Sequence, residues 1–248
     1  MKFFLAAVIA FLSLNNLPGQ TFQINRFSYL LSMGLLAALD ISNNYLDEKL
    51  LPEPSPSEIM ALDSRNIPWF DRWISYRRNK SWKNVSDYCY YLTFGAGLYC
   101  SYEEDYFWDN LLVLSQILVA QSAVGKWIKT GSGRYRPYVY DDPAEGYSQN
   151  GRHSFYSLHS SGSFAIATFA YYCYSKNNGS NLPLALVLFG GALSTSITRI
   201  VSAQHFPSDI LAGAVMGSGI SWLICLSHRQ NRLNVSCSAQ SLDVSWYF

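Results

Sequence analysis

Charged residues are scarce in this sequence, and the patterns that mark several other protein classes are missing. Only 14% of the 248 residues are charged, and the formal net charge is +1. A nucleic-acid-binding domain would show a basic stripe or patch, and a disordered chain would combine low hydrophobicity with a large net charge. The chain instead has 49% hydrophobic residues. We therefore expect a sizeable hydrophobic core and no nucleic-acid partner.

The five cysteines are odd in number and include no CxxC pair. This argues against a disulfide framework and against a zinc site. Cys89, Cys100, Cys173 and Cys225 lie inside apolar runs, where a cysteine behaves as a small hydrophobic residue. Internal repeats and low-complexity tracts are also missing, so one continuous domain is the expected organisation.

The N-terminus carries the pattern of a secretory signal. Lys2 is followed by an uncharged, largely apolar run over residues 3–14, and then by the helix breakers Asn15, Pro18 and Gly19. No clean small-x-small cleavage site follows, so the alternative is an uncleaved anchor. We predict a signal or anchor over residues 1–22, a helical domain over 23–232 and a tail over 233–248, which we interpret as solvated.

Six apolar segments follow this leader, and their length and lack of strand-like alternation indicate helices. They cover residues 27–39, 88–101, 111–128, 163–174, 182–203 and 210–227. A membrane-spanning helix needs about 20 mostly apolar residues, a length that only the last two segments approach. The expected fold is all-α, a six-helix bundle. We favour a membrane-embedded bundle with its active site at one polar edge, and a secreted soluble bundle is the alternative. The polar stretch 40–87 is expected to form short peripheral helices.

Three polar clusters interrupt the apolar segments, each at the end of a predicted helix. The first ends the third helix and holds Lys129 and Arg136; the second opens the fourth helix and holds His159 among serines. The third joins the fifth and sixth helices and holds His205 and Asp209. Taken singly, these are a cationic helix C-cap, serine N-caps and an acidic residue in a first helical turn.

Alternating helix directions would bring all three clusters to one face. That face would then hold cations, two histidines, a serine and a carboxylate. Phosphoryl transfer to histidine requires such a set, because cations and a helix N-terminus stabilise charge on the phosphoryl oxygens while one histidine attacks and another protonates the leaving oxygen. Asp209, four residues after His205, would bond one imidazole nitrogen and fix its tautomer.

The clusters resemble the signature of the type 2 phosphatidic acid phosphatase and vanadium haloperoxidase superfamily. Lys129, six intervening residues and Arg136 followed by proline match its first element. Arg199, His205 and Asp209 match its third element in residue and spacing, with threonine in place of serine before the arginine.

The second element, Pro-Ser-Gly-His in the family, is matched at Ser157 and His159 only. Tyr156 replaces the proline and Leu158 replaces the glycine. A register shifted to residues 160–163 would lose the histidine, and the flanking residues fit it less well.

The resemblance implies a role for each matched residue. Lys129, Arg136 and Arg199 would hold the phosphate, and Ser157 would donate a further hydrogen bond. His205 would attack phosphorus to form a phosphohistidine, and Asp209 would orient His205. His159 would act as general acid and then help to activate water. No metal and no other cofactor is implied for the phosphatase branch. A glycine at position 158 would let the backbone approach phosphate closely, so leucine there is expected to lower or narrow the activity.

Four functions compete on this sequence. The first is a membrane-embedded phosphatase acting on a lipid phosphate or diphosphate, and the second is a soluble secreted acid phosphatase acting on small phosphomonoesters. A vanadium-dependent haloperoxidase shares the motifs but is disfavoured by the short chain. A non-catalytic membrane protein with buried ions along a transport path would not require this spacing.

The expected location is the cell envelope. Six spans put both ends of the bundle opposite the active face, and Arg229 and Arg232 after the last helix favour a cytoplasmic location for that end. The site would then face the periplasm or the exterior, with secretion into the periplasm as the alternative. If the signal were cleaved, the new N-terminus would lie outside and the parity of six spans would be broken. The parity would then require that segment 27–39 does not cross the membrane.

Overall fold

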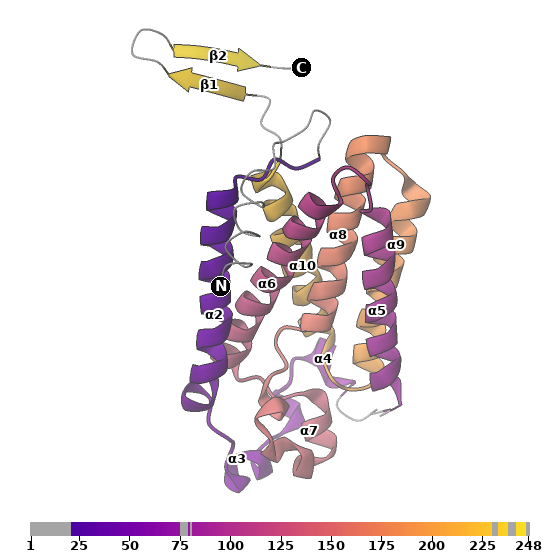
Figure 1. The fold of residues 1–248 in the computed structure, drawn as a ribbon. Coiled ribbons are helices and arrows are strands. Elements are labelled where there is room, and N and C mark those ends of the chain that lie inside the picture. The colour runs from indigo at the N-terminus through magenta and orange to yellow at the C-terminus, as the bar shows by residue number, and fades with distance from the viewer. Residues whose placement is uncertain (1–20, 75–78, 80, 230–232, 238–241, 247–248) are drawn as a thin grey trace, which may run out of the picture.

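The computed structural model describes residues 21–74, 79, 81–229, 233–237 and 242–246, so nearly all of the predicted targeting segment lies outside the described residues. The described part contains six long helices (Figure 1). They are α2 (Arg26–Leu50), α5 (Trp82–Cys100), α6 (Phe107–Ser132), α8 (Leu158–Asn178), α9 (Leu182–Val201) and α10 (Pro207–Ser227). The predicted all-α class is therefore confirmed, although the described part also holds short helices, so the helix count is not exactly six.

Five of the six long helices are longer than the apolar segments that predicted them, and α9 ends two residues before its segment. Three segments of the described chain are long and apolar enough to cross a membrane: Phe107–Asp141, which contains α6, and the helices α9 and α10. The sequence pointed only to the last two, because the apolar run of α6 was bounded at residues 111–128 while the helix continues for four residues at each end. The prediction of only two full-length spans was thus too low.

The helices alternate in direction, as predicted. At the lower end of Figure 1, α2, α6 and α9 end while α5, α8 and α10 begin. At the opposite end the chain closes on itself, because the backbone N–H of Gln23 donates to the carbonyl oxygen of His228 at 2.7 Å and Phe22 forms a β-bridge with Arg229. The three polar clusters therefore lie at one end of the bundle, and the paired residues 22–23 and 228–229 lie at the other.

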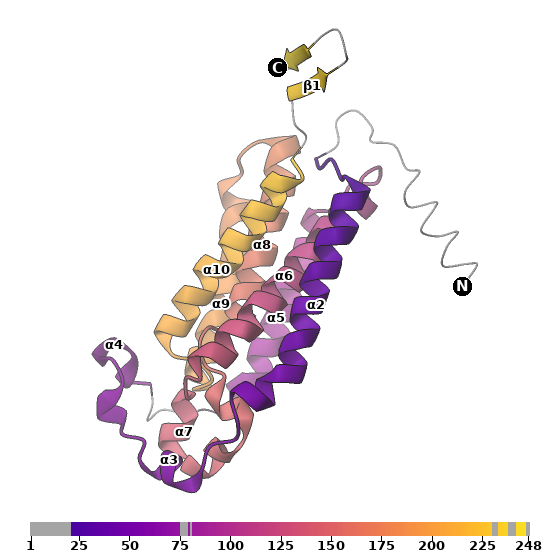
Figure 2. The ribbon, with the colours of Figure 1, turned by 90° about the vertical axis from the view of Figure 1, so that its left-hand side faces the viewer.

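The central helix is α8, which contacts α5, α6, α9 and α10, while α2 packs along α6 (Figure 2). Its buried side chains are mostly small: Ser160, Ser161, Gly162, Ser163, Ala165, Ala167 and Ala170. α10 approaches it closely at Gly213 and Gly217: an added Cβ at Gly213 would lie 2.7 Å from the carbonyl oxygen of Ser157, and one at Gly217 would collide with the Ser161 carbonyl. This small-xxx-small pattern lets two helix backbones meet.

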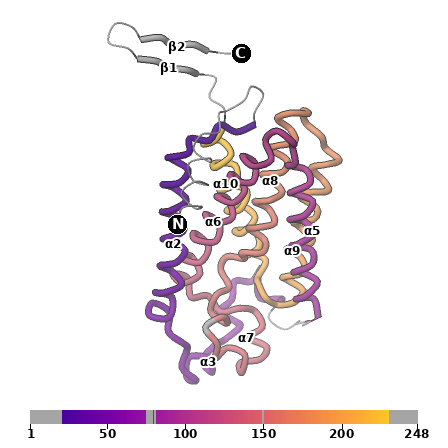
Figure 3. The backbone as a smooth tube through the Cα atoms, in the orientation of Figure 1, coloured from indigo at the N-terminus to yellow at the C-terminus, as the bar shows by residue number. Residues whose placement is uncertain are grey.

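The polar stretch 40–87 differs in part from its prediction. Its first eleven residues continue α2, and it then crosses the lower end of the bundle (Figure 3) as three short helices before α5 begins. These are α3 (Pro56–Met60), η1 (Ser64–Asn66) and α4 (Trp69–Arg72). Three more short helices follow α6 at the same end: α7 (Pro137–Asp141), η2 (Pro143–Tyr147) and η3 (Gln149–Arg152).

The tail forms a hairpin where we predicted solvated chain. Strands β1 (Leu233–Cys237) and β2 (Leu242–Trp246) pair antiparallel, with Leu233 opposite Trp246. The partial alternation of the sequence was the correct signal, because period two is the side-chain repeat of a strand. We discounted it because one strand cannot form a membrane barrel, whereas the pairing partner is the rest of the same tail.

Candidate active site

His205 lies in the link between α9 and α10, with only 1% of its surface exposed. Its Nδ1 is 2.8 Å from the carbonyl oxygen of Ser154, and 3.7 Å from Oδ2 of Asp209. The hydrogen bond that the sequence assigned to Asp209 is therefore made by a backbone carbonyl. A carbonyl only accepts, so this bond places a proton on Nδ1 and leaves Nε2 as the basic nitrogen.

Asp209 makes the helix-capping contact, which is one of the two alternatives that the sequence presented. Its Oδ2 accepts from the backbone N–H of Phe206 at 2.9 Å, which caps α10, and from the hydroxyl of Ser154 at 2.6 Å. The same carboxylate is the nearest anion to the His205 ring in the described chain. It thus caps the helix and, through Ser154, also holds the segment that carries the hydrogen-bond acceptor of His205.

Arg134 and Asp71 extend this network, and sequence reasoning missed both. Nη1 of Arg134 donates to Oδ1 of Asp209 at 2.5 Å, and its Nη2 lies 2.8 Å from Oδ2 of Asp71. Asp71, fully buried on α4, also accepts from the backbone N–H and the hydroxyl of Ser208. Arg134 lies two residues before Arg136 inside the first motif, and this position was the only signal that could have identified it.

The three cations assigned to phosphate binding are buried: Lys129 and Arg136 are each 7% exposed, and Arg199 is 4% exposed. Nζ of Lys129 donates to the carbonyl oxygen of His153 at 2.6 Å. The guanidinium of Arg136 donates to the backbone and side-chain oxygens of Asn150 and to the side-chain oxygen of Gln204, each at 2.9 Å. Within the described chain these partners are neutral. They accept hydrogen bonds from Lys129 and Arg136 but do not neutralise the two positive charges.

Arg199 contacts two residues of α5, and its guanidinium has a buried N–H donor without a partner in the described chain. Its Nη1 donates to the hydroxyl of Ser86 at 3.2 Å and lies 3.7 Å from Oδ1 of Asp87. Its Nε is buried and has no hydrogen-bond partner among the described residues. A buried donor without a partner is costly, and an anion bound at this point would supply one.

The structure brings these cations to His205. Burial lowers the pKa of His205 well below its usual value, and the positive charges of Arg136, Lys129 and Arg199 lower it further. Each of these charges disfavours the protonated ring. His205 is therefore neutral at neutral pH, which is the form in which an imidazole nitrogen can attack.

His159 lies in the first turn of α8 and also belongs to this assembly, because it is near enough to contribute to the lowered pKa of His205. Its Nε2 is 3.0 Å from Oδ1 of Asp87 on α5. The ring of Tyr90 meets the imidazole edge to face, with centroids 5.5 Å apart. Sequence reasoning missed Asp87, because it precedes the first motif by 42 positions and has no fixed spacing to any of the three elements.

Ser157 is the N-cap of α8: its hydroxyl accepts from the backbone N–H of Ser160 at 3.3 Å. Its own N–H donates to the carbonyl oxygen of Asp209 at 3.1 Å, which fixes the start of α8 against the start of α10. The residues that replace the family proline and glycine, Tyr156 and Leu158, both pack toward Gly125 of α6. All seven residues singled out in the sequence therefore lie at one end of the bundle, and the structural function of Ser157 is the capping one.

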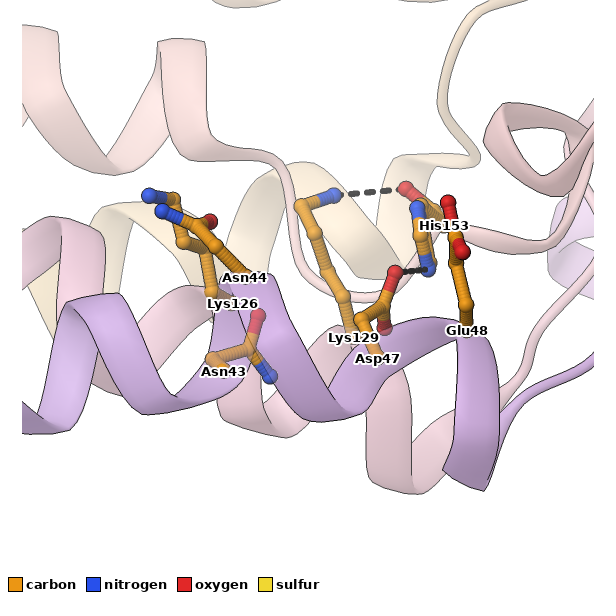
Figure 4. Close-up of a pocket in the computed structure, with 7 residues that line it drawn as sticks. All are labelled: Asn43, Asn44, Asp47, Glu48, Lys126, Lys129 and His153. Atoms are coloured by element: carbon orange, nitrogen blue, oxygen red, sulfur yellow. Dashed lines mark hydrogen bonds and ion pairs between the residues drawn. The ribbon is translucent and has the colours of Figure 1, made fainter.

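An open cavity of about 250 Å³ lies beside Lys129 (Figure 4). Lys129 and His153 form one wall, and the side chains of α2 face them. The remaining lining residues are Asn43, Asn44, Asp47, Glu48 and Lys126. His153 is bound by Asp47, with Nε2 3.2 Å from Oδ2. The lysine of the first motif is thus reached by a space wide enough for a polar group.

The model of the PAP2 superfamily matches residues 110–233. A PA-phosphatase related-family protein of Dictyostelium discoideum is 34% identical over 123 residues, which cover 45% of this chain and 45% of that protein. The lipid A 4′-phosphatase of Bacteroides thetaiotaomicron is 31% identical over 113 residues, which cover 43% of this chain and 48% of that enzyme.

The chain therefore aligns with less than half the length of either relative. No solved structure matches it. The family match includes Lys129, the start of α8 and the link that carries His205, and it extends over half of the chain. By this match, the chain belongs to the PAP2 superfamily.

Proposed function

We propose that this protein hydrolyses a phosphate or diphosphate ester of a lipid through a phosphohistidine intermediate, at the outer face of a membrane. The observation that carries the proposal is the group of buried, unneutralised cations around His205, a histidine whose Nδ1 is already engaged by Ser154. Buried charges are normally paired. Here a phosphoryl group would supply the missing negative charge.

In the first step, Nε2 of His205 attacks phosphorus and the bond to the leaving oxygen breaks. Lys129, Arg136 and Arg199 stabilise the charge on the non-bridging oxygens, and the N-terminus of α8 at Ser157 adds its dipole. His159 gives a proton to the leaving oxygen, which departs as an alcohol or as a phosphate.

In the second step, water attacks the phosphohistidine. His159, now neutral, takes a proton from that water, and the P–N bond breaks to release phosphate and free His205. Asp209 remains beside the ring throughout and stabilises the positive charge that develops on it. This sequence uses only side chains of the described site, and we propose that it needs no metal ion.

The lipid substrate and the membrane location rest on the surface of the bundle. Large apolar side chains are exposed along three of its helices, among them Phe27, Leu31 and Leu35 of α2, Leu182, Leu186 and Val187 of α9, and Leu211, Val215 and Leu223 of α10. Soluble monomers rarely expose apolar patches of this extent. Three segments also have the length and composition of membrane spans, and one relative bears the name of a lipid phosphatase.

The location of the site at the outer face rests on helix parity. The active end lies opposite the end that carries Arg229, which we place on the cytoplasmic side. A reporter fused after residue 229 tests this orientation, and we expect it to be protected from protease in sealed cells.

The decisive experiment measures phosphate release by the wild type and by His205→Ala. The substrates are phosphatidate, a polyprenyl diphosphate and p-nitrophenyl phosphate, each assayed with and without a chelator. We expect lipid-selective release that persists in chelator and is lost in the variant. Equal activity in the two proteins would exclude His205 as the nucleophile, and release from the soluble ester alone would indicate a secreted acid phosphatase.

A further inference from the structure

The start of α5 forms a wall of the site that lies outside the three motifs. Two successive residues, Ser86 and Asp87, each contact a residue of the phosphatase site. Ser86, fully buried, accepts from Arg199 at 3.2 Å, and Oδ1 of Asp87 lies 3.0 Å from Nε2 of His159 and 3.7 Å from Nη1 of Arg199. Both precede residue 110, where the family match begins. This wall is therefore a feature of this chain that the family pattern does not describe.

Apart from Asp87 in this wall, the groups around His159 disfavour the protonated form of its imidazole. Arg199 of α9, Arg136 before α7 and His205 of the α9–α10 link carry or can acquire positive charge, and Tyr90 of α5 presents a ring. Asp87 supplies the negative charge at this imidazole. A general acid must hold a proton before it can donate one, so His159 depends on a carboxylate to keep that proton beside the cations.

We propose that Asp87 is the positioning residue of the general acid His159. This rests on the proposed phosphatase function. The carboxylate of Asp87 accepts a hydrogen bond from Nε2–H of His159, which sets the ring orientation and stabilises the imidazolium. Nδ1–H then gives its proton to the leaving oxygen, and in the second step the same Nδ1 takes a proton from water. The proton on Nε2 stays in place through both steps, so the cycle balances without another group.

The arrangement at Asp87 mirrors the one at His205. In each pair a ring nitrogen is held by an acceptor, the carboxylate of Asp87 for His159 and the carbonyl of Ser154 for His205. The choice of acceptor fits the chemistry. An anion supports a ring that must be charged to act, and a neutral carbonyl supports one that must be neutral to attack.

The test compares Asp87→Asn, Asp87→Glu and the wild type on two leaving groups. The control is Asp105→Asn, which removes an exposed carboxylate in the loop at the other end of α5. Phosphatidate has a poor leaving group that requires a proton, whereas p-nitrophenyl phosphate has a good one that does not. We expect Asp87→Asn to lower kcat on phosphatidate by about 10- to 100-fold, which is at or below the lower bound of the range for general acid catalysis because His159 itself remains. Its kcat on the nitrophenyl ester should change little, and Asp87→Glu should recover part of the loss.

Two further measurements separate positioning from simple structural support. In a His159→Gln background, adding Asp87→Asn should cost little more, because the two residues act as a unit. In protein labelled with ¹⁵N-histidine, the titration of His159 should move to lower pH in Asp87→Asn and stay unchanged in Asp105→Asn. Equal losses on both esters, additive losses in the double variant, or faster turnover in Asp87→Asn would each overturn the proposal.

The titration also separates this proposal from the proposed function. If the wild type released phosphate from neither ester while the His159 titration still moved in Asp87→Asn, the phosphatase function would fail and the hold of Asp87 on His159 would stand. If phosphate were released and the titration did not move, the function would stand and the positioning role would fail.

Discussion

Leu158 packs into the space that Gly125 leaves open on α6, where any added Cβ would collide with its Cδ2. The hydroxyl of Tyr156 lies 3.2 Å from the same position. These are the two residues that depart from the family pattern in the second element. The side chain of Leu158 is accommodated by a helix neighbour, so the departure is a packing change shared by α6 and the start of α8.

Filling the space at Gly125 should therefore disturb the site. We expect Gly125→Val to lower stability by about 1–3 kcal/mol, the usual cost of overpacking, and to lower kcat because Leu158 precedes His159. Thermal unfolding in detergent and phosphate release check both effects. Leu158→Ala in the same protein should restore part of each, and Gly131→Val is the matched control because nothing lies within 4 Å of an added Cβ there. Equal effects of the two valines would contradict this account.

The contact between α8 and α10 gives a second prediction. Gly217→Ala would bring a Cβ against the backbone of Ser161, which cannot rotate away. We expect a loss of about 2 kcal/mol or more in detergent unfolding, because overpacking against backbone requires the helices to separate. Gly219→Ala on the same helix meets nothing within 4 Å and should be neutral or slightly stabilising.

Arg134 joins two fully buried carboxylates, Asp209 and Asp71. Arg134→Gln should destabilise the protein by about 3 kcal/mol, the lower part of the range for breaking a buried pair, because Arg134 is itself partly exposed. Arg65→Gln is the control, since its ion pair with Asp63 is exposed and solvent screening leaves it a small contribution to stability. Denaturant titration compares the two, and a loss in Arg134→Gln no larger than in the control would show that Arg134 is not essential to the network.

The environment of His205 predicts the acidic side of the pH profile. Burial and the nearby cations hold the pKa of His205 well below its usual value, and the proposed nucleophile is the unprotonated ring. As pH falls, the acid limb of kcat/KM should therefore appear below about pH 6.5, the ordinary histidine value. The profile is measured with two substrates whose phosphates ionise at different pH. A limb that belongs to the enzyme stays at the same pH with both substrates, whereas a limb that belongs to the substrate moves. Lys129→Met should move the enzyme limb to higher pH, and an unmoved limb would assign it to another group.

Much of the fold and the site could be predicted from the sequence. The alternating helices follow from six apolar runs, and the meeting of Lys129, His159 and His205 follows from helix parity alone. Both predictions rest on local patterns that repeat along the chain, namely apolar runs and the polar clusters at their ends. The predicted hydrogen bond from Asp209 to an imidazole nitrogen of His205 is not made. Asp209 was close in sequence, while the carbonyl of Ser154 becomes close only when α8 meets α10.

The contacts that sequence reasoning missed share one physical cause. Asp71 on α4 and Asp87 on α5 lie 63 and 72 positions before their partners Arg134 and His159, and nothing in a single sequence links residues at such separations. An isolated Asp in a polar stretch resembles a solvated surface residue. It becomes a partner of Arg134 or His159 only through packing.

The division of the site between two stretches of chain has a consequence for how such an enzyme diverges. The reacting groups lie within residues 110–233, whereas Asp71, Ser86 and Asp87 lie before them. A chimera that exchanged residues 51–109 for those of a relative would retain Lys129, His159 and His205 but would acquire different outer supports. Such a chimera would test whether the outer supports can change while the residues around His205 stay the same.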